Sequence, residues 1–172
     1  GLYTVANRII LIPAALLGGS LAEAFRCEFA TTRLSGLAIT PVFKKHLIPI
    51  ILLSAILFGI IYTFCPYVLS FVFGSEFSNS ASIAKSLVFA GFSLFACTPF
   101  AYVCSIFFKS SGLIGQVFLG IFPIITLVTL LKTNALITQA LFGYSITTFL
   151  GAVLLLWIMY RECIAYDQKI LN

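Results

Sequence analysis

Apolar residues in this chain come in long blocks, and the charged residues fall between the blocks. Four stretches contain no Asp, Glu, Lys or Arg: residues 46–75, 86–108, 110–131 and 133–160. Each is longer than the roughly 20 residues that a helix needs to cross the hydrocarbon core of a bilayer, which is about 30 Å thick. Length alone therefore predicts four membrane-spanning helices.

A fifth apolar block is shorter, because residues 9–22 lie between Arg8 and Glu23. This block can span a bilayer only if its helix includes residues 1–8, with Arg8 snorkelling to the surface or facing protein. We therefore predict an all-α fold, a polytopic transmembrane helical bundle of about five spans in which residues 1–172 form one domain. The predicted spans are 2–29, 44–73, 80–108, 112–131 and 134–165.

Turn-forming residues mark the predicted connections. Segment 30–43 contains Thr, Ser, Gly and Pro and is the longest of them. Within it, Leu34, Leu37 and Ala38 can form a short helix in the membrane interface. Residues 110–112 and 133–134 are predicted to be tight turns.

Composition supports a membrane protein. Hydrophobic residues make up 61% of the chain and charged residues 9%, whereas soluble domains carry about 25% charged residues. The net charge of +5 reflects Lys and Arg in short loops, so it does not indicate nucleic-acid binding.

Lys and Arg are distributed unevenly between alternate loops, which predicts an orientation by the positive-inside rule. One side of the five-span topology holds Lys85 and Lys132. The other side, expected to be cytoplasmic, holds Arg26, Arg33, Lys44, Lys45, Lys109, Arg161 and Lys169. Gly1 is then on the outer side and Asn172 in the cytoplasm.

The first predicted helix has a polar side in its outer half. Thr4 and Arg8 are four residues apart, as are Tyr3 and Asn7, so each pair shares a helix face. A guanidinium can bind a phosphate through two parallel hydrogen bonds. Arg8 can therefore line a cavity and contact an anionic substrate. The alternative is that Arg8 snorkels to outer head groups or pairs with another helix.

Two further features of this helix have alternative interpretations. Glu23 and Arg26, three residues apart, can pair with each other or act as a gate in which Glu23 exchanges partners. Pro13, followed by Gly18 and Gly19, can be a hinge or a static kink. The small residues Ala14, Gly18 and Ala22, four apart, predict close packing against another helix.

We expect no enzymatic activity, metal or cofactor. The chain has no G-x-x-x-x-G-K-[ST] loop, no H-E-x-x-H motif and no carboxylate pair within an apolar span. His46, the only histidine, is expected to anchor the second helix at the cytoplasmic interface beside Lys44 and Lys45. The five cysteines are scattered, which is typical of buried structural cysteines.

Two segments resemble the polysaccharide flippases, the Wzx-type O-antigen transporters of the multidrug/oligosaccharidyl-lipid/polysaccharide (MOP) superfamily. The first thirteen residues, GLYTVANRIILIP, resemble the family segment G-x-Y-x-x-A-x-R-I-x-x-x-P, and Gly18-Gly19-Ser20-Leu21 and Phe25 continue the similarity. Later, Phe73-Gly74-Ser75-Glu76-Phe77 with Ala81 is similar to the family's turn between two spans. The resemblance covers about residues 1–108.

The resemblance implies a C-terminal bundle of a MOP-type transporter whose N-terminal helical bundle precedes Gly1. Such a transporter would move undecaprenyl-diphosphate-linked O-antigen or capsule repeat units across the bacterial inner membrane by alternating access. Arg8, Asn7, Thr4 and Tyr3 would contact the substrate. The implied partners are membrane lipids, the lipid-linked oligosaccharide, a polysaccharide polymerase and a chain-length regulator, with no nucleic acid.

Three other functions stay open. A multidrug or metabolite cation antiporter of the same superfamily would need a carboxylate within a span. A membrane-embedded polysaccharide enzyme would need a large polar loop with clustered His, Asp or Arg, and the longest loop here has none. A passive assembly subunit would need no polar face such as the one around Arg8.

Overall fold

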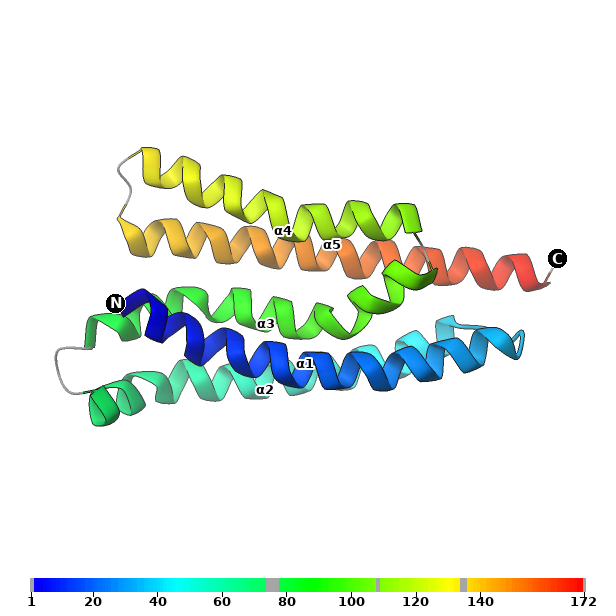
Figure 1. The fold of residues 1–172 in the computed structure, drawn as a ribbon, viewed down its shortest axis with the longest axis horizontal. Helices are drawn as coiled ribbons and strands as arrows, with labels where there is room; N and C mark the ends of the chain where they lie inside the picture. The colour runs from blue at the N-terminus through cyan, green and yellow to red at the C-terminus, as the bar shows by residue number, and fades with distance from the viewer. Residues whose placement is uncertain (1, 74–77, 108, 134–135, 172) are drawn as a thin grey trace.

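The computed structural model describes residues 2–73, 78–107, 109–133 and 136–171. It describes their side chains except those of 2–9, 11–15, 70, 72–73, 78–81, 101–107, 109–113 and 171. The described chain is helical almost throughout, as α1 (Leu2–Leu34), α2 (Thr40–Phe73), α3 (Ser78–Phe107), α4 (Lys109–Lys132) and α5 (Ile137–Leu171). The helices run up and down along one long axis (Figure 1). The predicted all-α bundle of about five spans is confirmed.

The helices are long enough to cross a bilayer. Even α4, with 24 residues, measures about 36 Å at a rise of 1.5 Å per residue. Within the described residues, α2, α3, α4 and α5 each contain a segment long and apolar enough to span. Because lipid offers no hydrogen bonds to the backbone, a helix is the conformation in which such segments satisfy their own polar groups. The chain is a multi-pass membrane protein.

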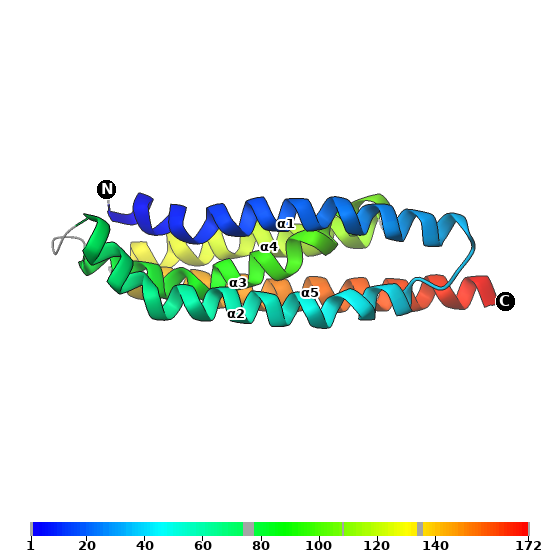
Figure 2. The same cartoon turned by 90° about the horizontal axis from the view of Figure 1, so that it is seen from below.

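The third helix is the centre of the bundle. In its segment Ser82–Phe100, 61% of the residues are buried, against 11–33% in the candidate spans of the other three helices. Helix α1 packs along one side of α3, and α2 and α5 each pack against α3 (Figure 2). Helix α4 packs mainly on α5.

Two apolar clusters fill the interior, and α3 contributes to both. Towards the 35–39 turn, the cluster is built around Phe29, Phe43, Phe100 and Met159. Towards the opposite end, the cluster is built around Ile10, Phe58, Phe95 and Leu141. Helix α3 bends towards its C-terminal end (Figure 1), and its sequence has Pro99 inside the helix. A proline inside a helix removes one backbone hydrogen bond, which accounts for the bend.

Buried hydroxyl groups tie the central helix to its neighbours. The Ser54 hydroxyl of α2 donates a 3.0 Å hydrogen bond to the Phe92 carbonyl of α3. The Ser145 hydroxyl of α5 donates to the Ser86 carbonyl of α3. Glycines allow α4 and α5 to approach closely, since a Cβ on Gly151 would lie 3.2 Å from the Leu119 Cα. Such contacts replace the hydrophobic effect, which does not drive helix association within lipid.

The helix boundaries correct several predictions. Segment 30–43 is not a long loop with its own interfacial helix, because α1 continues to Leu34 and α2 begins at Thr40. Thr31, Thr32 and Ser35 stay compatible with helix since their hydroxyls donate to carbonyls one turn earlier. The helix ends at Leu34, and Gly36 in the following turn has a φ of 65°.

The end of α1 has the hydrogen bonds of a Schellman motif. The Leu37 N–H donates to the Thr32 carbonyl, and the Gly36 N–H donates to the Arg33 carbonyl, each at 3.1 Å. Glycine accepts the left-handed conformation that this motif requires. The motif explains why the connection shrinks to five residues, 35–39.

The remaining boundaries also differ from prediction. Residues 110–112 are not a turn, because α4 begins at Lys109 and includes them. Helix α3 begins at 78 instead of 80, and the predicted end at 108 lies outside the described residues. Helix α4 ends at 132 instead of 131. Helix α5 covers 137–171 instead of 134–165, so its last turns extend past the predicted end of the span.

Candidate functional site

The polar residues predicted to bind substrate lie at the start of α1. Tyr3, Thr4, Asn7 and Arg8 occupy its first two turns, at the end of the bundle opposite the 35–39 turn (Figure 1). Their side chains lie outside the described residues, so their role stays a prediction. Ile10, one turn later, is fully buried, and a Cβ on Gly91 of α3 would clash with it. This part of α1 therefore packs directly on α3.

The residues of the proposed hinge differ in their surroundings. A Cβ on Gly18 would lie 3.2 Å from the Thr98 Cβ of α3, whereas a Cβ on Gly19 would meet nothing within 4 Å. Ala22, one turn after Gly18, is 2% exposed. Gly18 and Ala22 thus lie at the α1–α3 contact, as the small-residue row predicts, and the Ala14 side chain lies outside the described residues. Bending at Pro13 stays a prediction.

Glu23 and Arg26 pair with each other on the surface. Their side chains approach to 3.4 Å, with exposed fractions of 63% for Glu23 and 49% for Arg26. This geometry agrees with the simpler of the two interpretations, a local ion pair. Exposed pairs of this kind contribute about 0–1 kcal/mol. The exchange of partners required of a gate stays a prediction.

A neighbouring carboxylate, Glu28, joins the end of α1 to the start of α2. Glu28 Oε1 accepts a 2.9 Å hydrogen bond from Lys45 Nζ, and Glu28 Oε2 lies 2.6 Å from His46 Nε2. The His46 ring packs on Phe25, with ring centroids 4.3 Å apart. The hydrogen bond from Lys45, together with that of His46, lowers the pKa of Glu28 below its usual value.

His46 joins the start of α2 to α1 through Glu28, a partner that sequence inspection did not identify. Its position at the cytoplasmic interface stays a prediction. Glu28 precedes Lys45 and His46 by 17 and 18 residues, so no helical spacing links them. The sequence offered one indication only. A carboxylate stands shortly before the first predicted connection, and a Lys-Lys-His run stands shortly after it. The tight turn at 35–39 brings them together.

Asp167 is a second carboxylate that the sequence did not single out. Its Oδ1 accepts a 2.7 Å hydrogen bond from the Ile39 N–H, and its Oδ2 accepts a 3.0 Å bond from the Thr40 N–H. These donors belong to the first turn of α2, where backbone N–H groups have no partner within the helix. Asp167 therefore caps α2 from the last turns of α5.

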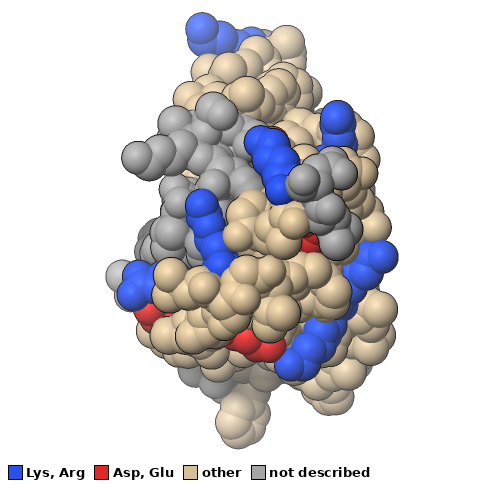
Figure 3. Space-filling view, turned by 90° about the vertical axis from the view of Figure 1, so that its right-hand side faces the viewer, with Lys and Arg blue, Asp and Glu red and all other residues tan. Residues whose placement is uncertain are grey.

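Lys, Arg and aromatic side chains gather at this charged end of the bundle, defined by the 35–39 turn and the last turns of α5. Figure 3 looks onto it and shows Lys and Arg spread around Asp and Glu. Three cations lie over aromatic rings at 5.1–5.5 Å: Arg33 over Tyr166, Lys44 over Tyr160 and Arg161 over Trp157. Aromatic and basic residues are enriched where helices leave a membrane.

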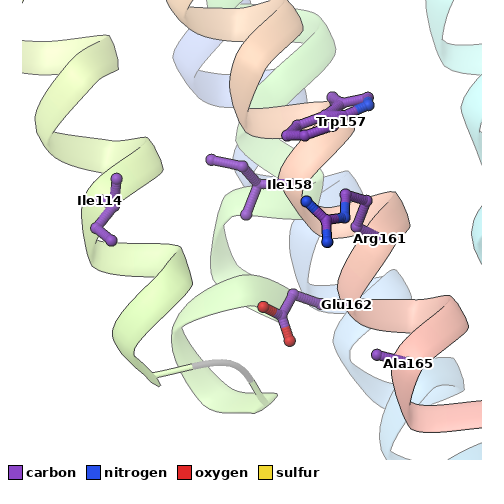
Figure 4. A pocket seen from close by; sticks show the side chains of 6 residues that line it. All are labelled: Ile114, Trp157, Ile158, Arg161, Glu162 and Ala165. Atoms are coloured by element: carbon purple, nitrogen blue, oxygen red, sulfur yellow. The ribbon is translucent and has the colours of Figure 1, made fainter.

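A pocket of about 280 Å³ opens between α4 and α5 at the same end. Its wall is mainly apolar, with Ile114, Ile158 and Ala165, and its polar groups are Arg161 and Glu162 (Figure 4). The arrangement can hold the interfacial part of a lipid. Among the described residues, His, Cys, Asp and Glu form no group of three that could hold a metal ion.

Comparison of the chain with models of protein families, with curated proteins and with solved structures gave no match.

Proposed function

We propose that this chain belongs to a transporter that moves lipid-linked oligosaccharide across the bacterial inner membrane. The substrate would be an undecaprenyl-diphosphate-linked O-antigen or capsule repeat unit. Two sequence segments that resemble polysaccharide flippases support the proposal, and a multi-pass, all-helical bundle is the architecture that such a transporter requires. Because both segments resemble the later part of the flippase sequences, we assign the chain to the C-terminal bundle of a two-bundle transporter.

The observation that carries the proposal is the position of the flippase-like residues in the fold. Ile10, Gly18 and Phe25 all come from the first resembling segment, and all three are buried. Gly18 contacts Thr98 of α3, and the Phe25 ring lies 5.8 Å from the Phe100 ring of α3. The small, apolar and aromatic residues of this segment therefore form the contact between α1 and the central helix, and this contact requires residues of these sizes at these positions.

In the proposed mechanism, α1 presents its polar first turns to a cavity shared with the N-terminal bundle. Arg8 would bind the diphosphate through its guanidinium, and Asn7, Thr4 and Tyr3 would bind neighbouring oxygens. The hydrocarbon tail would stay in the bilayer while the two bundles rock about the site. Hinge motion at Pro13 would let the outer half of α1 move while Gly18 keeps the inner half on α3.

The alternative, a multidrug or metabolite cation antiporter, would need a carboxylate within a span to couple cation and substrate. The four described acidic residues, Glu23, Glu28, Glu162 and Asp167, all lie towards the charged end. This distribution favours the oligosaccharide substrate over a cationic one.

We place the charged end in the cytoplasm. Six described cations with exposed side chains lie there, at positions 26, 33, 44, 45, 161 and 169, and α4 begins there at Lys109. At the other end are Lys85 and Lys132. By the positive-inside rule, the excess of Lys and Arg stays on the cytoplasmic side.

Deletion of the gene that encodes the chain tests the transport function. Lipid-linked oligosaccharide and surface polysaccharide are measured together, and the intact gene and its Arg8→Ala variant are returned on a plasmid. We expect complete oligosaccharide to accumulate on the cytoplasmic leaflet without surface polymer. The intact gene should restore the polymer and the Arg8→Ala gene should restore much less.

Normal surface polymer without accumulation would contradict the flippase function. Sensitivity of the deletion strain to cationic drugs, with normal polymer, would instead support the antiporter. Expression of the Arg8→Ala protein at the level of the intact protein is the necessary control.

A further inference from the structure

A lateral apolar groove runs between α2 and α5, with α3 as its floor. Its wider part, about 490 Å³, is lined by Phe58, Gly59 and Tyr62 of α2, Val88 of α3 and Phe149 of α5. A narrower part of about 180 Å³ continues it along Ile51 of α2, Ser93 of α3 and Ala152 of α5. Phe92 and Phe149 line both parts, so the two form one groove.

The groove is about as long as the lipid chains of one leaflet. Along α2 it extends from Ile51 to Thr63, which is about 18 Å at 1.5 Å per residue. Half of the hydrocarbon core measures about 15 Å. The groove lies within candidate spans of all three helices, which places it at the depth of the hydrocarbon core.

One cation lies at the end of the groove nearest the α2–α3 connection. Lys85 Nζ is 5.1 Å from the centre of the Tyr62 ring, and Tyr62 is a wall residue of the groove. The lysine is half-buried, and Val88, one turn later on α3, continues into the groove. No ion pair joins Lys85 to a carboxylate within the described ranges, where Asp and Glu all lie towards the other end of the bundle.

We propose that this groove binds one anionic phospholipid from the leaflet at the α2–α3 connection. An acyl chain lies along Phe58, Phe92 and Phe149, and the phosphate meets Lys85. A single ammonium group matches the single charge of a phosphodiester. A diphosphate would call for more positive charge than Lys85 supplies. Lys132, whose side chain is also described at this end, lies on α4 and does not line the groove.

Gly59 supplies the variant that tests the groove. A Cβ at Gly59 would meet nothing within 4 Å, so Gly59→Leu fills the groove without a clash. Gly120 of α4 also has open space around it and does not line the groove, which makes Gly120→Leu the matched control. Ala55→Leu, at another exposed wall position, is a second groove-filling variant.

The measurement is native mass spectrometry of the full chain in mild detergent, with phosphatidylglycerol, phosphatidylethanolamine and undecaprenyl diphosphate as probes. We expect one phosphatidylglycerol retained per chain, preferred over phosphatidylethanolamine by about fivefold, the factor expected for one lysine near a membrane surface. Lys85→Ala should remove the preference, and Lys132→Ala should keep it. Gly59→Leu and Ala55→Leu should lose the bound lipid, while Gly120→Leu should retain it.

Three results would overturn the proposal. The first is lipid retention by both groove-filling variants at the level of Gly120→Leu. The second is equal retention of the two phospholipids by the unaltered protein. The third is displacement of phosphatidylglycerol by an equimolar amount of undecaprenyl diphosphate, which would assign the groove to a polyprenyl carrier. Helicity by circular dichroism checks that each variant is folded.

Discussion

At the scale of single residues, the surroundings of two adjacent glycines differ sharply. Gly18 faces Thr98 of α3, and Gly19 faces open space. Replacing Gly18 by Leu forces extra atoms into the α1–α3 contact, and overpacking of this kind typically costs about 1–3 kcal/mol. We expect Gly18→Leu to lower the free energy of unfolding in detergent by that amount.

Gly19→Leu is the matched control for this prediction. It adds the same side chain one residue later, where no neighbour lies within 4 Å of the new Cβ, so its stability should be close to that of the unaltered protein. Equal destabilisation by both substitutions would show that α1 does not pack on α3 through Gly18.

Asp167 forms hydrogen bonds with residues that are distant in the sequence. Its carboxylate accepts hydrogen bonds from the Ile39 and Thr40 N–H groups, 128 and 127 residues earlier. Loss of a helix cap costs typically about 1 kcal/mol, and the negative charge also interacts favourably with the helix N-terminus. We expect Asp167→Ala to destabilise the protein by about this much and to speed amide hydrogen exchange at residues 39–42.

The neighbouring Gln168→Ala substitution, at an exposed position, should change neither quantity. If exchange at residues 39–42 stays as slow in Asp167→Ala as in Gln168→Ala, the cap does not form in solution.

At the scale of elements, α1 and α2 have few contacts except near the turn that joins them. The Glu28 carboxylate there bonds Lys45 and His46 of α2. Its pKa is lowered below 4.5 by these bonds. The stabilisation is therefore fully present above about pH 4.5 and is lost as the pH falls through the lower, folded-state pKa.

We expect hydrogen exchange around residues 25–30 and 43–47 to speed up when the pH falls below 4.5, after correction for intrinsic rates. Glu28→Gln should show the faster exchange already at neutral pH and should lose this pH response. Glu23→Gln, which removes only an exposed local pair, should behave like the unaltered protein. A pH response retained in Glu28→Gln would assign it to another group.

At the scale of the whole molecule, the alternation of five helices separates a charged end (Figure 3) from an end with fewer cations. Cys27 reports which side the charged end faces, because it is exposed near that end while Cys65, Cys97 and Cys163 are buried. We expect a membrane-impermeant maleimide to label Cys27 in inside-out vesicles and not in intact spheroplasts.

Cys27→Ser identifies the labelled site, since it should remove the label from the peptide that contains residue 27. Labelling of spheroplasts that disappears in Cys27→Ser would reverse the orientation and place Arg8 on the cytoplasmic side.

Long apolar blocks and the charges between them were sufficient to predict the number, type and approximate position of the helices. The reason is that lipid imposes one solution on a long apolar segment, a helix with all its backbone hydrogen bonds internal. Local chemistry also indicated that Glu23 and Arg26 could pair, and that Gly18 and Ala22 belonged to a packing face.

Only the tertiary structure decided which helix is central, where the turns begin and which distant charges meet. The 35–39 turn depends on Gly36 closing a Schellman motif, and Asp167 reaches α2 because α5 extends to residue 171. Helix packing brings Glu28 to Lys45 and His46. Helix packing also forms the groove between α2 and α5. Sequence periodicity describes the faces of one helix and contains no information on which faces will meet.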